Sequence, residues 1–136
     1  IIGILAAIAI PQYQDYIART RVSDCPASSG NIKQSVAQAL QDGSVTFSSG
    51  RDLNSNASLA TVSDASYATS NILNVDIDTV ADNVVTITCT FRAGILPGYL
   101  STATPTLILQ SRSNEANIRW VASAGGTVLA KHKPKQ

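Results

Sequence analysis

The amino-acid sequence predicts an α+β fold in which a long N-terminal helix packs against a four-stranded antiparallel sheet. Apolar residues recur at helical spacing from Ile1 to about Leu40. Four segments that alternate apolar and polar residues then follow one another between Leu73 and Ala122, and this period of two is typical of half-buried strands. One helix followed by consecutive strands favours a meander laid over the second half of the helix.

The helix begins with an apolar run, since every residue from Ile1 to Ile10 is apolar or Gly. Such a run is a helix of roughly 15 Å, about half of a bilayer core. A membrane or further copies of the chain must cover it. Because the run is too short to span a membrane and starts without an initiator Met, we expect the natural chain to extend upstream.

Two places along the helix should bend or interrupt it. Pro11 removes a backbone donor and should kink the helix, and Gly3 loosens the same segment. The second weak point is Asp24-Cys25-Pro26 with the Ser and Gly residues up to 30. Beyond Pro11 the helix is amphipathic, and its apolar face carries Ala18, Val22, Cys25, Ile32, Val36 and Leu40. Asp42-Gly43 should end it.

The segment from Gly43 to about Asn71 has no period and should be a long surface connection. We expect Leu53, Leu59 and Tyr67 to anchor it. The strand residues expected to face the core are Leu73, Val75 and Ile77, then Val85, Ile87, Cys89 and Phe91, then Leu107 and Leu109, and finally Ile118, Trp120 and Ala122. Turns are expected at 81–83 and 114–117, and a loop at 93–104.

The first stretch, IIGILAAIAIPQYQDYIAR, resembles the rear half of the N-terminal segment of type IV pilins. The likeness rests on a Gly inside the apolar run, an Ala-rich centre, Ile-Pro, and Gln-Tyr-x-Asp-Tyr-Ile-Ala-Arg, and it is close to unbroken from Ile1 to Arg21. The processed, methylated N-terminal Phe of that family and the Glu that follows it would lie upstream of Ile1.

The resemblance implies two parts, a stalk helix at residues 1–21 and a globular head at residues 22–136. In the family the stalk anchors the subunit in the inner membrane and later packs in the filament core. The residues assigned to that role are Ile1, Ile2, Gly3, Ile4, Leu5, Ala7, Ile8, Ile10 and Pro11. The implied function is a type IVa-like major subunit of an extracellular pilus, for adhesion, twitching motility and DNA uptake.

The implied partners are copies of the chain itself, the inner membrane before assembly, the pilus assembly machinery, and host surfaces or DNA. Three alternatives stay open: a minor pilin, a type II secretion pseudopilin, and a membrane-tethered binding domain that never polymerises. The net charge of +1 makes no case for nucleic acid as the main partner.

Cys25 and Cys89 both fall on apolar faces that meet if the sheet packs on the helix. Because an exported protein lives in an oxidising compartment, we expect them to form a disulfide, with two separate buried thiols as the alternative. Many type IV pilins also close a C-terminal loop with two Cys, one shortly after a strand Trp. Here Ala122 stands where the first would be expected, and no Cys lies near Gln136.

The C-terminal tail is basic, and its candidates for a surface interaction are Lys131, His132, Lys133 and Lys135. A solvated C-terminus is the favoured interpretation. The chain is not expected to be an enzyme, since its single His lies between two Lys and no triad is plausible. Asp76 and Asp78 share a strand face and are interpreted as the wet side of an edge strand. No cofactor or metal site is expected.

Overall fold

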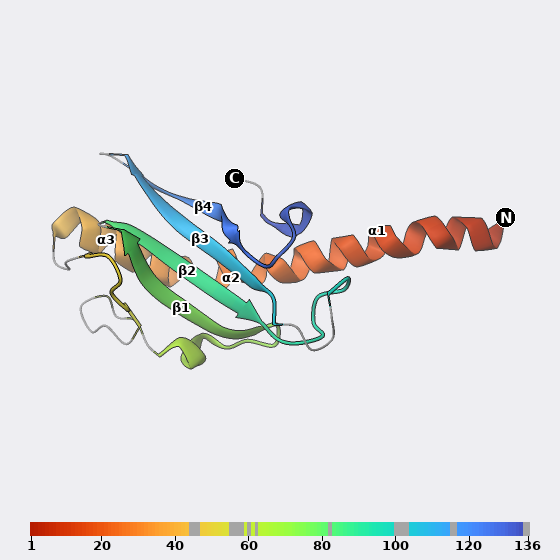
Figure 1. The fold of residues 1–136 in the computed structure, drawn as a ribbon, viewed down its shortest axis with the longest axis horizontal. Helices are drawn as coiled ribbons and strands as arrows, with labels where there is room; N and C mark the ends of the chain where they lie inside the picture. The colour runs from red at the N-terminus through yellow and green to blue at the C-terminus, as the bar shows by residue number, and fades with distance from the viewer. Residues whose placement is uncertain are drawn as a thin grey trace.

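The N-terminal region folds into three consecutive helices. They are α1 (Ile2–Val22), α2 (Asp24–Ser28) and α3 (Gly30–Asp42), and they follow one another along the length of the molecule (Figure 1). The computed structural model describes residues 1–43, 47–54, 59, 61, 63–81, 83–99, 104–114 and 117–134.

The interruptions between the helices fall at Ser23 and Ser29, around the weak point that the sequence predicts. Pro11 lies inside α1, and the helix continues past it. Gly43 follows α3 with a φ of 62°. This left-handed conformation suits glycine, so Gly43 stops the helix as expected.

Four strands form one sheet in the order β1-β2-β3-β4, and each strand is antiparallel to its neighbours. Their bounds are β1 (Ile72–Ala81), β2 (Val84–Phe91), β3 (Thr106–Asn114) and β4 (Asn117–Gly126). The 3-10 helices η2 (Asp64–Tyr67) and η3 (Ala130–His132) lie outside the sheet. The helices cover one face of the sheet (Figure 1), so the α+β prediction is confirmed.

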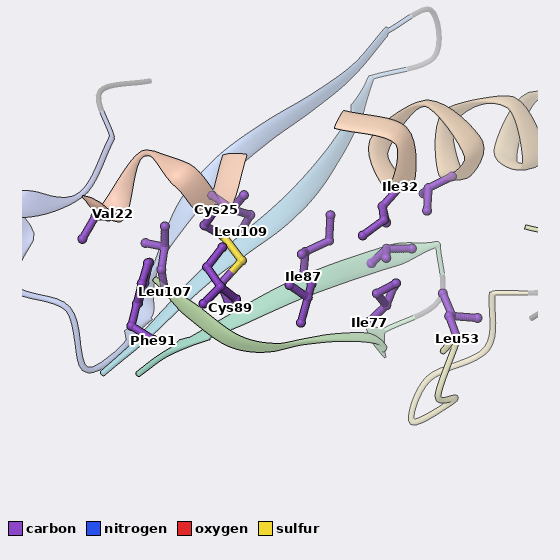
Figure 2. Packing of buried hydrophobic residues seen from close by; sticks show 14 of the residues in the cluster. Val22, Cys25, Ile32, Leu53, Ile77, Ile87, Cys89, Phe91, Leu107 and Leu109 are labelled. Atoms are coloured by element: carbon purple, nitrogen blue, oxygen red, sulfur yellow. A yellow bond between two sulfur atoms is a disulfide. The ribbon is translucent and has the colours of Figure 1, made fainter. Parts of the chain in front are cut away.

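The core lies between that sheet face and the helices (Figure 2). On the sheet side it contains two rows of cross-strand neighbours, Val75–Cys89–Leu107 and Ile77–Ile87–Leu109. On the helix side Val22, Cys25, Ile32 and Val36 are buried. Trp120 and Ala122 of β4 pack against the edge of this core. Strand alternation and helix period therefore supply the two halves of one apolar interior. The prediction for Leu73 is wrong: Leu73 is exposed and Ile72 is buried in its place, because the register of β1 against β2 shifts between Ile72 and Asn74.

Strand β4 ends at Gly126, as the Gly125-Gly126 pair predicts. Gly126 has a φ of 82°. A Cβ atom there would lie 2.6 Å from the carbonyl oxygen of Thr106. Glycine is therefore required by both the backbone conformation and the close approach of β3.

Residues 47–54 pair with the outer edge of β1, which is a feature that the sequence analysis missed. The Leu53 N–H donates to the Ile77 carbonyl at 2.8 Å, and the Thr79 N–H donates to the Arg51 carbonyl at 2.9 Å. Asp76 and Asp78 therefore do not lie on a bare edge strand. Leu53 and Leu59 are buried and Tyr67 packs against the core, as expected for anchors, and Phe47 is a further anchor.

Candidate functional site: the exposed stalk helix and its contact with the C-terminal tail

The described residues leave the apolar run at the start of α1 uncovered. Helix α1 extends well beyond the sheet, with the N-terminus at its far end (Figure 1). Ile1 is 97% exposed and Ile10 is still 57% exposed, and burial begins only at Ala18. All of the residues assigned to the filament core or membrane, from Ile1 to Pro11, are exposed. A contiguous apolar surface of this kind marks an interaction site.

No helix in the described ranges is both long enough and apolar enough to cross a membrane.

An apolar groove lies where the exposed run meets the head. Its volume is about 620 Å³. Ile10, Tyr13 and Ile17 form one wall, and Pro97 from the loop between β2 and β3 contributes to the other. Gln14 also lines the groove, so a mostly apolar surface continues from the stalk up to the head.

A disulfide joins Cys25 of α2 to Cys89 of β2, with a Cα–Cα distance of 6.0 Å. Both residues are fully buried, and the bond crosses the core from the helix to the sheet (Figure 2). This is the pairing that the sequence analysis expected. It ties the layer that carries the stalk to a central strand of the head.

The C-terminal tail, defined here as residues 129–134, docks on α1. The Asp15 carboxylate oxygen Oδ1 accepts from Lys131 Nζ at 2.8 Å and lies 3.0 Å from His132 Nε2. His132 is only 2% exposed. The favoured interpretation of a solvated C-terminus is therefore wrong for His132, because the contact with the stalk helix buries its ring.

The loop before β3 holds the same histidine from the other side. The Tyr99 hydroxyl lies 3.2 Å from His132 Nδ1, and it accepts a hydrogen bond from the Leu129 N–H at 2.7 Å. The hydroxyl proton is then free to point at Nδ1, which leaves the proton of Nε2 for Asp15. His132 is thus fixed between stalk and head.

Lys133 is committed to β4. Its ammonium group donates to the carbonyls of Ser123, Ala124 and Gly125 at 2.6, 3.3 and 3.0 Å. Of the four residues proposed for a surface interaction, Lys131 is 52% exposed, whereas Lys135 lies outside the described residues. The tail is therefore a docked segment.

No model of a known protein family matches the chain, but individual proteins do. Fimbrial protein EcpC of Eikenella corrodens is 33% identical over 135 residues, which cover 98% of this chain and 79% of that protein. A type IV major fimbrial protein FimA of Dichelobacter nodosus is 31% identical over 140 residues, covering 98% and 85%.

This chain belongs to the type IV pilins.

The pilin also has a shorter match of higher identity. Another FimA of Dichelobacter nodosus is 56% identical over 46 residues, which are 34% of this chain and 29% of that relative. The match thus spans less than a third of that relative's length.

The tail of this pilin is held without the usual C-terminal pair of cysteines. The two cysteines of the chain are bonded to each other across the core. In place of a second disulfide, Asp15 and Tyr99 fix His132, and β4 carbonyls fix Lys133. The sequence offered one signal for this contact, a lone Asp on the stalk helix and a basic tail, but nothing in it paired them.

The contact with the tail lowers the pKa of Asp15 below its ordinary value of 3.8, first through the Lys131 hydrogen bond and then through His132. A folded-state pKa below the unfolded one stabilises the fold at pH above the unfolded value. That stabilisation is lost as the pH falls through the folded pKa. The docking of the tail should therefore be unaffected by Asp15 titration at neutral pH and weaken in acid below the ordinary Asp range.

We predict that Asp15→Asn loosens the tail at neutral pH and removes this acid dependence. The amide of His132, which donates to the Leu129 carbonyl at 2.9 Å, should then exchange its hydrogen faster. Hydrogen exchange followed by NMR measures this directly. Asp42→Asn, at the exposed end of α3, is the matched control and should leave the tail unchanged. Equal exchange in Asp15→Asn and wild type would show that Tyr99 and Lys133 hold the tail alone.

An acidic cluster lies along β1, at the edge of the sheet that residues 47–54 cover. Carboxylate oxygens of Asp52, Asp76 and Asp78 all lie within 4.8 Å of one another. Burial raises the pKa of Asp76, and the charges of Asp78 and Asp52 add to the effect. Alternation along β1 places Asp76 and Asp78 together, whereas Asp52 joins them only through the pairing of residues 47–54 with that strand, which no sequence pattern indicates. Three carboxylates at this separation could hold a metal ion, although exposed acidic groups of this kind are common without one.

Proposed function

We propose that this pilin is a major structural subunit that polymerises into an extracellular type IV pilus filament. The observation that carries the proposal is the apolar run Ile1–Ile10, which the monomer leaves exposed. Burying it against identical helices stabilises an assembly by about 25 cal/mol per Å². In the proposed filament this contact joins different surfaces of neighbouring copies and its rotation does not close, so the product is an open helical fibre and not a ring.

The proposal includes two stages and the roles that the family implies. Before assembly the stalk, residues 1–21, sits in the inner membrane, and the assembly machinery then transfers it to the filament core. Adhesion, twitching motility and DNA uptake, with host surfaces or DNA as contacts, follow from the resemblance. The exposed side chain of Lys131 supports the proposed contact with DNA or acidic host surfaces, because it presents a positive charge to solvent.

Shearing the surface of bacteria that make the protein tests this function. Fibres seen by electron microscopy, with this chain as the abundant component in mass spectrometry, are the expected result. A trace amount in the sheared fraction would indicate a minor pilin or a pseudopilin. If bacteria with the complete assembly machinery make no fibres, the chain is a membrane-tethered binding domain.

We further propose that the head, residues 22–136, folds without the stalk. A variant that begins at Val22 should be soluble and monomeric, because the apolar run is gone and the sheet still covers the helix face. A variant that begins at Gln12 should melt at a higher temperature, since it keeps Ala18 in the core and Asp15 on the tail. Size-exclusion chromatography and thermal unfolding measure both effects. Aggregation of both variants would place the boundary between stalk and head elsewhere.

A further inference from the structure

The contact between stalk and tail encloses a second cavity, of about 410 Å³. Arg19 of α1 and Ser23, which follows that helix, form one side, and residues 130–134 of the tail form the other. The tail is fixed beside the cavity by the contacts of Asp15 and Tyr99 with His132 and of Lys133 with β4 carbonyls. Its volume falls in the range of small-molecule sites, so it is large enough for a headgroup or a small anion.

The lining of this cavity is basic. Arg19, Lys131 and Lys133 line it, and the described lining residues include no acid. Lys133 is saturated by carbonyls, and Lys131 gives one donor to Asp15, which leaves Lys131 two further N–H donors. For the Arg19 guanidinium, one turn beyond Asp15, no partner is found within the described ranges, whereas Arg21 donates to the Ile95 carbonyl. Arg19 and Lys131 thus present unused charge-assisted donors to one space.

The position of the cavity along α1 indicates which anion it meets. The apolar run ends at Ile10, and Tyr13 and Tyr16 follow, 65% and 68% exposed. Tyrosines with an apolar body and a polar tip occupy the headgroup level of membranes. Arg19 lies three residues beyond Tyr16, or about 4.5 Å along the helix axis. Apolar run, tyrosines and basic cavity therefore succeed one another in the order of hydrocarbon, interface and phosphate.

We propose that the cavity between stalk and tail binds the phosphate group of an anionic phospholipid headgroup while the subunit is in the membrane. Guanidinium and ammonium donors suit phosphate oxygens. The inference rests on the membrane stage of the proposed function. It adds a specific lipid contact that sets the depth of the stalk and holds the tail toward the bilayer.

The test is an NMR titration of the full chain in an uncharged detergent, followed through the Arg19 side-chain N–H and the amides of residues 130–133. The probe is dihexanoyl phosphatidylglycerol below the concentration at which it forms micelles. Dihexanoylglycerol, which lacks the phosphate, is the matched lipid, and inorganic phosphate is the third arm. Saturable shifts are expected with phosphatidylglycerol, and dihexanoylglycerol should cause none.

Arg19→Gln should weaken phosphatidylglycerol binding about tenfold or more, as expected for the loss of a charge-assisted hydrogen bond. Arg119→Gln removes the same charge from an exposed position on β4 and should change the Kd less than about twofold. Equal effects of the two substitutions, or shifts that never saturate, would overturn the proposal in favour of general surface charge. Inorganic phosphate that binds as tightly as the lipid would overturn the lipid assignment.

Flotation separates this inference from the proposed function. The full chain is mixed with vesicles of uncharged lipid and centrifuged through a density gradient. Wild-type protein that floats but shows no saturable phosphatidylglycerol shift would overturn the headgroup site alone. Protein that stays at the bottom of the gradient would overturn the membrane stage, and the headgroup site with it.

Discussion

Ala7→Phe should leave the pilin in the inner membrane at its normal level while fibres are reduced or lost. Ala7 is exposed on α1, and the exposed Ile4 and Ile10, three residues away on either side, are its neighbours on the helix surface. Lipid chains can accommodate a larger apolar side chain, but closely packed helices cannot, because small residues let their backbones approach. The two surroundings are equally apolar, so the substitution separates packing from hydrophobicity. Immunoblots of the membrane fraction and electron microscopy of sheared fibres measure the two outcomes.

Ala7→Ser is the matched control, since it adds a single atom at the same position and should assemble. Normal fibres from Ala7→Phe would show that stalks are not tightly packed at this residue. Loss of both membrane protein and fibres would point to degradation, in which case the variant reports on turnover and not on packing.

Removing the disulfide should lower the free energy of unfolding by about 4 kcal/mol in the chain-entropy estimate. The bond closes a loop with a sequence separation of 64, so its loss enlarges the unfolded ensemble. The measurement is urea unfolding of the soluble variant that begins at Gln12, with and without the paired substitutions Cys25→Ala and Cys89→Ala. The paired substitutions also truncate two buried side chains, which adds a loss of packing. The same Gln12 variant with its native cysteines reduced therefore measures the loss of the bond alone.

The thiols can also be counted directly. Mass measurement after alkylation without reductant should find no free thiol in the exported protein. Two alkylated cysteines under those conditions would contradict the disulfide, and reduction would then change stability little.

Strand alternation and helix period predicted the fold because each pattern depends only on residues close together in the sequence. Val85, Ile87, Cys89 and Phe91 alternate with threonines, and all four are buried on one face of β2. The helix residues that recur at steps of three, four and seven meet that face, so each pattern needs only the other to bury it. Cys25 and Cys89 could be paired in advance for the same reason, since each lay on one of the two faces.

Contacts between distant segments without a period were not predictable. Residues 50–53 pair with β1 through backbone groups, and the Phe47 carbonyl accepts from the Asn83 N–H just after that strand. Because every residue carries these backbone groups, the sequence of the segment does not indicate the pairing. His132 lies 117 positions from Asp15. A histidine between two lysines predicts a solvated terminus. In the folded chain Tyr99 and Asp15 contact His132 and its ring is buried. In both cases the stabilising contact is with a residue far away in the sequence, so no local pattern marks it.

The covalent link between α2 and β2 has a mechanical consequence for a fibre under tension. A pull along α1 loads the helix first, and packing alone would let it peel away from the sheet one turn at a time. The bond at Cys25 stops that peeling, because the load passes there into the backbone of a central strand. Only residues 1–24 can then unravel, which lengthens each subunit by at most about 50 Å. A fibre of such subunits could lengthen through its stalk helices while the sheets on its outer surface stay folded.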